Sequence, residues 1–519
     1  MLHKILVVIR ALSTQIWIVA ALFWGCTESL EAQSKVPALA SVAEVRSGWQ
    51  GLPKQYQQSS DWKPVGHGPK GMWFYLREAS NYRLEYRDLR HQVLQSVRLP
   101  DYLERSTGCR LSYQNERPVL FFDLFNSETG DHGMFKAGIS TDSNRAEPPV
   151  LVAESRGHDP RDLLEFEWLD RDSLNQTWLV HRSLGKTTMR LHGILLDQGD
   201  QRLDSFSLVV PQEAWSVDAS TGLFELQDFH ALKKVGQATA AMLVTLKERR
   251  KSRNPVTWGL LVLDLRTKTF ATLTLNTPDR EAQALALGCG PEHKDLLVYG
   301  LALGKPQETP SKTLCYRVTK TPEGSLQASC AARILDPEAS SLLAQFNSDL
   351  RNMTVQYGYF LELHLDSLQG ASLAWRRRLR TSETMVQYSQ GMPVYREIIR
   401  YHAREWLLTR IQADGLATWS QVLPMQITQS ESNSSLLSTS MVLGSTWILG
   451  GYQTSNLRTQ PFMFRIQPDG TVWNGDLHGG LKDLQIRWTQ AFALDHNNAV
   501  IPTRKRSREG LLYLHHLFP

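Results

Sequence analysis

RIQADG at residues 410–415 returns almost unchanged as RIQPDG at residues 465–470, 55 positions later. Each copy follows an apolar, strand-like run and turns at Asp-Gly, a dipeptide that readily supplies the positive φ of a tight hairpin turn. Each then continues as a second short strand that carries a tryptophan, Trp419 or Trp473. A hairpin that returns at this period indicates a solenoid, a propeller or another repeat array.

Weaker relatives of this hairpin recur along the chain, for example Leu314–Val318 before the turn Pro322–Gly324. Short apolar and alternating runs bounded by Gly, Pro, Asp and Asn dominate, and no long stretch has a 3.6-residue period. A spacing near fifty residues fits a four-stranded blade, and the lack of crossover helices argues against an α/β fold. The sequence therefore predicts an all-β fold, a single β-propeller of seven or eight four-stranded blades over residues 46–519. A strand near 42–45 is expected to complete the blade formed by the C-terminal strands and to close the ring.

Residues 406–420 resemble the repeat of bacterial exported propellers, in which a Trp-Leu strand meets Arg-Leu-x-x-Asp-Gly and then Trp; Ile411 replaces the leucine. Residues 447–473 resemble the next repeat of the same type. Residues 217–222 are faintly similar to the Asp-Ala-x-Thr-Gly turn of quinoprotein-like repeats, but lack the tryptophan that completes that motif. The clear resemblance covers roughly residues 395–478, and it implies a fold but says little about activity.

The N-terminus has the features of an export signal. Lys4 and Arg10 precede an apolar core at 11–24 that is short for a membrane span, and Gly25-Cys26 follows it. This arrangement resembles a bacterial lipoprotein signal, which implies a signal peptide at 1–25, a lipid on Cys26 and a polar tether at 26–45. Cleavage near Ala32 and an uncleaved anchor are the alternatives, and all three export the protein. No acidic residue directly follows the cysteine. By the same resemblance, this favours a location of the protein at the periplasmic face of the outer membrane or at the cell surface.

Four cysteines remain for the exported domain. Cys315 and Cys330 lie nearly symmetrically about the turn at 321–324, so we expect a disulfide across this hairpin, with Cys109 and Cys289 as the remaining pair. Four buried thiols are the alternative. The sequence contains no CxxC pair and no Cys/His cluster with metal-ligand spacing, so we expect neither a metal nor another cofactor.

The charge of the chain is mildly positive. A net charge of +5 over 519 residues is far from the footprint of a nucleic-acid binder. Two basic runs are more informative: if each joins the second and third strands of its blade, both emerge at the same end of the ring and attract an anionic glycan or lipid surface. Solvated hairpin tips are the alternative. The predicted binding residues are Lys247, Arg249, Arg250, Lys251, Arg253, Arg504, Lys505, Arg506 and Arg508.

No catalytic motif stands out in the sequence. We therefore expect a binding or scaffolding module for an envelope protein or glycan. The alternative is a carbohydrate hydrolase or lyase with carboxylates at the propeller channel, for which Glu362, Glu405 and Asp476 are the candidates. Isolated histidines within strands, such as His181 and His402, are expected to be hydrogen-bonded core or face residues.

Overall fold

The computed structural model describes the chain between residues 45 and 516, with gaps that fall mostly between strands; residues 1–44 and 517–519 lie outside it. The longest internal gaps are 52–60, 100–108, 170–175, 216–223, 249–256, 276–281, 289–295, 346–354, 431–438 and 476–483. The predicted signal peptide, lipidated Cys26 and most of the tether therefore lie outside the described residues. No helix within the described part is long and apolar enough to cross a membrane.

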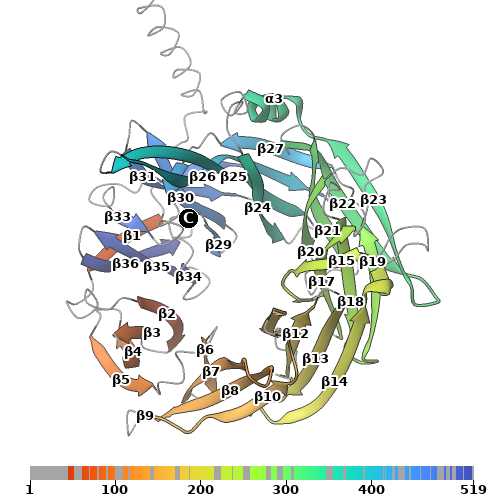
Figure 1. The fold of residues 1–519 in the computed structure, drawn as a ribbon, viewed down its shortest axis with the longest axis vertical. Helices are drawn as coiled ribbons and strands as arrows, with labels where there is room; N and C mark the ends of the chain where they lie inside the picture. Colours follow the sequence, from red (N-terminus) through yellow and green to blue (C-terminus); the bar gives the residue numbers. More distant parts are fainter. Residues whose placement is uncertain are drawn as a thin grey trace, which may run out of the picture.

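The strands form eight units arranged as a ring, which we name blades A to H (Figure 1). Every pairing within a blade is antiparallel, and blades B and C are joined by one parallel contact between β5 and β9. The sheet order places the first strand of blades B to H at one edge, and in Figure 1 the successive strands run outward from the centre of the ring. The fold is the expected single β-propeller, with eight blades.

The strands of the first four blades in chain order are as follows. Blade B has β2 (Asp61–Gly68), β3 (Gly71–Glu78), β4 (Asn81–Asp88) and β5 (Val93–Leu99). Blade C has β6 (Cys109–Gln114), β7 (Arg117–Asn126), β8 (Asp131–Ser140), β9 (Arg145–Ala146) and β10 (Val150–Ser155). Blade D has β11 (Leu163–Trp168), β12 (Thr177–Leu184), β13 (Thr188–Leu196) and β14 (Arg202–Pro211), followed by the short 3-10 helix η2 (Gln212–Trp215). Blade E has β15 (Phe224–Phe229), β16 (Lys233–Lys234), β17 (Thr239–Glu248), β18 (Thr257–Asp264) and β19 (Thr269–Leu275).

The remaining blades complete the ring. Blade F has β20 (Ala282–Gly288), β21 (Leu296–Gly304), β22 (Thr309–Lys320) and β23 (Leu326–Ile334), followed by helix α3 (Pro337–Gln345). Blade G has β24 (Val355–Leu365), β25 (Ala371–Ser389), β26 (Met392–Ile411), β27 (Ala417–Leu423) and β28 (Ile427–Ser430). Blade H has β29 (Thr439–Leu443), β30 (Thr446–Ser455), β31 (Arg458–Ile466) and β32 (Val472–Gly475). Blade A has β33 (Leu484–Ile486), β34 (Phe492–Ala493), β35 (Asn498–Lys505), β36 (Arg508–His516) and, from the other end of the chain, β1 (Val45–Gly51).

The two ends of the chain close the ring together. β1 pairs with β36 from Val45 opposite His516 to Gly51 opposite Gly510, so the N-terminal strand supplies the outer strand of blade A. The prediction of a closing N-terminal strand is confirmed, although that strand starts at Val45 and extends beyond the expected segment. Closure in this way protects the strand edges that a sheet of this kind would otherwise expose.

The two RIQxDG copies are the turns between the third and fourth strands of neighbouring blades G and H. Both turns use the same hydrogen bonds: Gln412 N donates to Leu416 O at 2.9 Å, and Gln467 N donates to Thr471 O at 2.9 Å. Gly470 has a φ of 91°, and a Cβ there would also collide with the ring of Trp419 in blade G. The repeat therefore fixes both the turn and a contact between blades.

The core lies between blades, because alternate residues of each strand face the neighbouring blade. One cluster joins blades D and E around Val180, Trp215 and Val244, and another joins blades F and G around Tyr299, Trp375 and Leu407. Helix α3 adds Leu343 to the second cluster. This packing between blades explains why the strands are apolar on both faces.

The predicted disulfide between Cys315 and Cys330 is wrong. In the β22–β23 pair, Cys315 lies opposite Ala331 and Cys330 lies opposite Tyr316, a register shifted by one residue. Successive residues of a strand point to opposite faces, so the two sulfurs lie on different sides of blade F. Both residues are thiols, and burial raises the pKa of Cys315 to about 12. Cys289 and the side chain of Cys109 lie outside the described residues, so that pairing stays a prediction.

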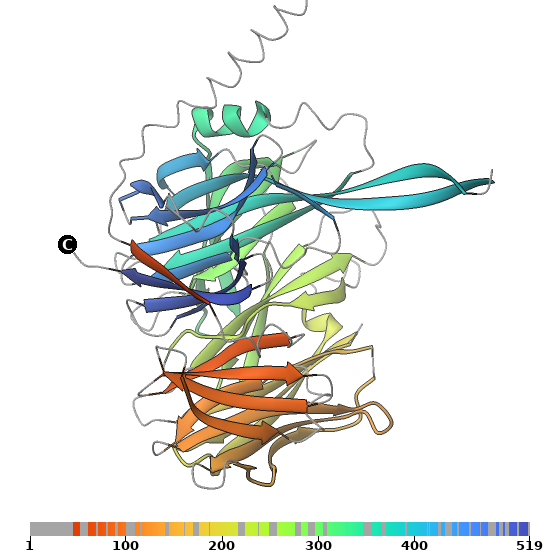
Figure 2. The ribbon, with the colours of Figure 1, turned by 90° about the vertical axis from the view of Figure 1, so that its left-hand side faces the viewer.

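Blade G departs from the other blades in the length of its middle strands. β25 has 19 residues and β26 has 20, and they continue as a two-stranded ribbon well beyond the ring (Figure 2). We call residues Ser382–Ser389 and Met392–Ile399 the arm. They pair with each other, whereas β24 pairs with β25 only as far as Thr381 and β28 pairs with β26 from Arg400 to Ala403.

Candidate functional site

Blade D concentrates polar side chains on both faces of its first two strands. Along β11, Glu165 and Glu167 point to one face and Phe166 to the other, because side chains alternate along a strand. The register places Glu165 opposite Arg182 and Phe166 opposite His181 on β12. One face therefore carries an ion-pair cluster toward blade E, and the other carries a histidine cluster toward blade C.

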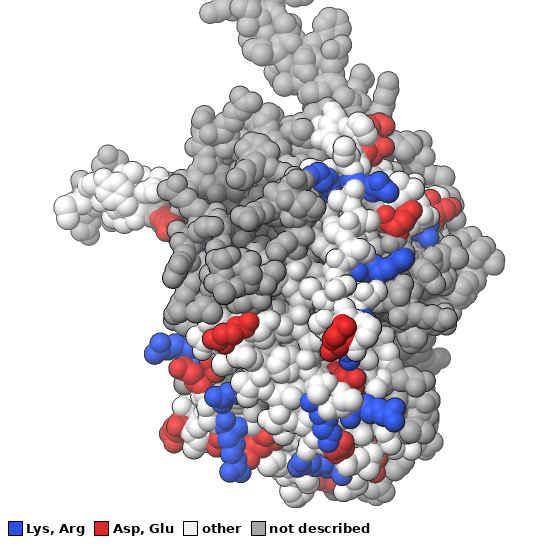
Figure 3. Space-filling model, turned by 90° about the vertical axis from the view of Figure 1, so that its right-hand side faces the viewer, with Lys and Arg blue, Asp and Glu red and all other residues white. Residues whose placement is uncertain are grey.

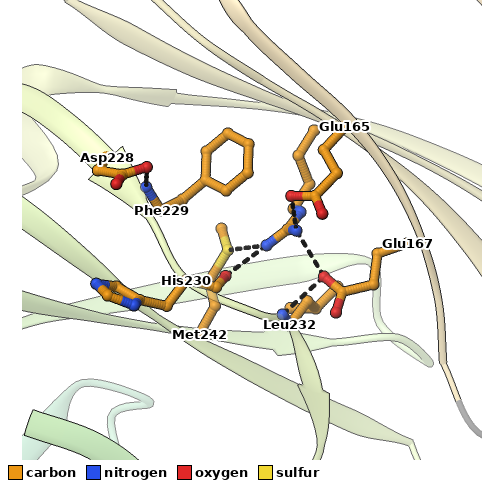
Figure 4. A network of polar contacts seen from close by, with 8 residues as sticks. Glu165, Glu167, Asp228, Phe229, His230, Leu232 and Met242 are labelled. Atoms are coloured by element: carbon orange, nitrogen blue, oxygen red, sulfur yellow. Dashed lines mark hydrogen bonds and ion pairs between the residues drawn. The ribbon is translucent and has the colours of Figure 1, made fainter. Parts of the chain in front are cut away.

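The ion-pair cluster is centred on Arg182, whose side chain is completely buried (Figure 4). Its Nη2 atom lies 2.5 Å from Glu165 Oε2 and 2.6 Å from Glu167 Oε2. Its Nη1 atom donates a hydrogen bond of 2.5 Å to His230 O, and the guanidinium lies 4.3 Å from the centre of the Phe229 ring. The planar guanidinium thus links the first strands of blades D and E by charge-assisted hydrogen bonds and a cation–π contact.

The two carboxylates differ in environment. The Glu165 side chain is 53% exposed, whereas that of Glu167 is 20% exposed and accepts a further 2.8 Å hydrogen bond from Leu232 N. Burial raises the pKa of Glu167, and the nearby Arg182 charge only partly opposes this. Burial in turn lowers the pKa of Arg182, while both carboxylates favour its charged form. Both carboxylates therefore contact the arginine, but only that of Glu165 is largely open to solvent.

The histidine cluster fills the boundary between blades C and D. His132 Nε2 lies 3.0 Å from Asp123 Oδ2, and His132 Nδ1 lies 3.0 Å from His181 Nε2. His158, just after β10, lies 2.7 Å from Ser155 Oγ through Nε2, and its ring centre is 5.0 Å from that of His181. If Asp123 accepts from His132 Nε2–H, His132 Nδ1 accepts from His181 Nε2–H, and His181 Nδ1 carries a lone pair.

Burial favours the neutral forms of two of these histidines, His181 and His158. Burial, followed by the neighbouring histidines, lowers the pKa of His181 to about 2, and burial also lowers the pKa of His158. The Nδ1 atoms of both rings are buried, and neither has a hydrogen-bond partner among the described residues. In the described part of the chain, no three His, Cys, Asp or Glu side chains are placed to hold a metal ion together. The expectation that His181 is a hydrogen-bonded core residue is confirmed, as it is for His402, which lies 2.8 Å from Thr381 Oγ1.

The predicted basic segments occupy equivalent places in their blades. Residues 247–253 follow β17 and precede β18, and residues 504–508 join β35 to β36, so each segment links the second and third strands of its blade. Lys247 and Arg504 are exposed, but residues 249–256, 506 and 507 lie outside the described part. Blades E and A lie on opposite sides of the ring in Figure 1, so the two segments share one end of the ring without forming a single patch.

The arm also links the second and third strands of its blade, and blade G lies midway between blades E and A in the order of the ring. Apolar side chains are exposed near its turn, namely Val386 (44%), Met392 (71%), Val394 (47%) and Tyr395 (69%), and the polar Gln387 is exposed among them. One end of the ring therefore carries an apolar projection between two basic connections. We call this end the arm face.

Of the three carboxylates predicted for the channel, only Glu405 has a described side chain. Glu405 is completely buried on β26, the third strand of blade G, and therefore does not line the inside of the ring. Glu362 is on the first strand of that blade, but its side chain lies outside the described residues, as does Asp476. The structure brings together two other carboxylates, Glu165 and Glu167. Their sequence signal is the alternation of residues 163–168, which matches no catalytic motif.

Comparisons with known proteins give little further information. No family model matches the chain, and no curated protein matches it. Among solved structures, a PL25 ulvan lyase is 8% identical with a TM-score of 0.34, covering 83% of this chain and 96% of its own. The GH93 α-L-arabinofuranosidase of Fusarium graminearum is 7% identical with a TM-score of 0.31, covering 80% and 93%. A Synechocystis apocarotenoid oxygenase mutant is 8% identical with a TM-score of 0.29, covering 92% and 95%. Such low scores carry no argument about this chain.

Proposed function

We propose that the protein is exported, is held through a lipid on Cys26 at the outer membrane or cell surface, and acts by binding an envelope protein or an anionic glycan. The arrangement of the arm face is the observation that carries this proposal. Three connections of the same kind, two of them basic and one apolar and elongated, emerge at one end of a rigid ring. Loops at one end of a scaffold can specialise for binding without disturbing its core.

Fractionation tests the anchor. Cys26→Ser should move the protein from the membrane fraction to the soluble fraction, because the acceptor of the lipid is removed. Ala32→Ser is the matched control, since it alters the competing cleavage region and leaves Cys26 in place. Retention of the Cys26→Ser protein in the membrane fraction would refute the lipid anchor.

Capture of partners tests the binding role. Replacing Lys247 and Arg504 by Gln should weaken capture of an anionic polysaccharide such as alginate, and the loss should be larger at low salt than at high salt. Arg190 and Arg202, which are exposed on blade D, give the matched control when both are replaced by Gln. Equal capture by both double variants would remove the basic connections from the binding site.

A second candidate, a carbohydrate-active enzyme, is favoured by one observation. The Oε2 atoms of Glu165 and Glu167 are no more than about 5 Å apart, because both lie within 2.6 Å of one nitrogen of Arg182. Retaining glycosidases use two carboxyl groups about 5 Å apart, one of them a proton donor with a raised pKa. The shared arginine weakens this reading, since both carboxylates are already engaged in an ion pair. Turnover of a polysaccharide that is lost in both Glu165→Gln and Glu167→Gln, but kept in Glu154→Gln, would establish the enzyme.

A further inference from the structure

The arm is a two-stranded ribbon that extends beyond the other strands of blade G. Ser382–Ser389 and Met392–Ile399 contribute eight residues each, which pair only with each other in the described part of the chain. At a rise of about 3.3 Å per residue, the ribbon extends roughly 26 Å beyond its last neighbouring strand. Isolated two-stranded hairpins are marginally stable in water, so a ribbon of this length gains from an external partner.

Exposed apolar side chains lie on both faces of the ribbon near its turn, and Gln387 is an exposed polar residue among them. Val386 lies opposite Tyr395, which places both side chains on one face. Met392 and Val394 are two residues apart on β26 and point to the other face. All four side chains are exposed, and the end of the arm, which projects to the left in Figure 3, shows mainly uncharged atoms among its described residues. A flat protein surface would cover only one of these two faces, whereas a partner that surrounds the end of the arm would cover both.

A lipid bilayer is a partner that surrounds an inserted element on all sides. The charges of the arm face complement an anionic headgroup layer, since Lys247 and Arg504 are exposed at the same end of the ring and Arg400 is exposed at the base of the arm. Tyr395 has the apolar ring and polar tip that favour the boundary between headgroups and acyl chains. Nearer the ring, Ser382 Oγ donates to Glu397 Oε1 at 2.5 Å, so the arm becomes polar where it would leave the lipid.

We propose that the end of the arm, formed by Val386, Met392, Val394 and Tyr395, inserts into the headgroup and outer acyl region of an anionic bilayer. The depth is limited because the outer edges of the ribbon carry backbone N–H and C=O groups, which would be costly in the hydrocarbon core. This inference deepens the proposed binding role of the arm face and rests on it, and it names the lipid surface as the partner of the arm.

Vesicle binding of the full chain tests the inference in the Cys26→Ser background, so that no covalent lipid contributes. Vesicles of phosphatidylglycerol and phosphatidylethanolamine should co-sediment the protein, and pure phosphatidylcholine vesicles should do so more weakly because headgroup charge is lost. Adding Met392→Asp and Tyr395→Asp should weaken binding at least tenfold, given the free energy of burying one large apolar side chain. Leu151→Asp with Val209→Asp, at similarly exposed positions on the outer strands β10 and β14, is the matched control and should bind as the parent does.

Hydrogen exchange gives a second readout. Vesicles should slow amide exchange in residues 382–399 and leave the outer strands unchanged. Equal vesicle binding by the arm variant and the control, or unchanged exchange in the arm, would overturn the lipid assignment. Loss of a captured envelope protein in the arm variant, with vesicle binding intact, would also overturn it and would identify a protein as the partner. Failure of alginate capture alone would count against the proposed glycan binding and not against the lipid contact.

Discussion

The ion-pair cluster of blade D and the arm of blade G are opposite exceptions to the rule that charged side chains are exposed and large apolar side chains are buried. Arg182 is completely buried with two glutamates beside it, whereas Met392 and Tyr395 are about 70% exposed with no described side chain covering them. Buried charges must be paired to be tolerated, and large apolar side chains gain from leaving water. The buried charge of the cluster is paired by glutamates of the same chain. The apolar side chains of the arm are not shielded from water by any described residue of the chain. This difference separates a polar cluster that holds two blades together from an apolar segment that we propose for binding.

The largest expected effect comes from removing the charge at the centre of the cluster. Arg182→Met should lower the free energy of unfolding by about 3 kcal/mol, because it leaves Glu167 partly buried beside an apolar group and removes contacts to blade E. Arg190→Met, at an exposed position on the neighbouring strand β13, is the control and should change stability by less than about 0.5 kcal/mol. Denaturant unfolding measures both, and equal losses would contradict a supporting role for the cluster.

The next effect is the response of the histidine side of blade D to acid. His181 has a pKa of about 2 in the folded protein, below the ordinary value of 6.5, so the unfolded chain binds its proton first as the pH falls. The contribution of His181 to stability is complete above about pH 6.5 and is lost progressively down to about pH 2, with about 2 kcal/mol lost by pH 5. His181→Phe should flatten this part of the stability–pH profile, measured by denaturant unfolding at each pH. A stability–pH profile of His181→Phe as steep as that of the parent protein would contradict the assignment of this pH dependence to His181.

A smaller effect separates the two carboxylates of the cluster. Glu167→Gln should destabilise the protein more than Glu165→Gln, because Glu167 is less exposed and also accepts a hydrogen bond from Leu232 N. We expect about 1.5 kcal/mol for Glu167→Gln and less for Glu165→Gln, from the lower end of the usual range for a hydrogen bond to a charged group. Thermal unfolding of the two variants gives the order, and the reverse order would contradict the difference in environment.

The smallest effect is expected at the arm. Met392→Gln and Val394→Thr should leave the free energy of unfolding within about 0.5 kcal/mol of the parent, because exposed side chains contribute little to the folded state. Calorimetry measures this, with Leu407→Ala in the buried part of β26 as a destabilising reference. A loss of unfolding free energy comparable to that of Leu407→Ala would show that the arm packs against the rest of the protein. The difference between the buried cluster of blade D and the exposed arm would then not hold.

The sequence was sufficient for the architecture because its signals are local. The turn of 465–470 and the alternation of the strands depend on backbone chemistry that neighbouring residues specify. The pairing of Cys315 with Cys330 failed because a shift of one residue in register reverses the face of a side chain, and symmetry about a turn does not determine register. The cluster around Arg182 was missed because it joins residues that are distant in sequence and belong to two blades. The arm was not predicted, since alternation along the sequence alone cannot show where a ribbon leaves its sheet.

The pairing of β1 with β36 has a consequence for the order in which the chain can fold. β1, the first strand of the described residues, finds its partner only when β36 has been synthesised, so the ring stays open at blade A until the residues of β36 are available. Such a contact between the two ends of the chain carries a large loop-closure entropy and is expected late on the folding path. Until then, the edges of blades B and H are without their closing neighbour, and a chain truncated before Arg508 would remain in that open, aggregation-prone form.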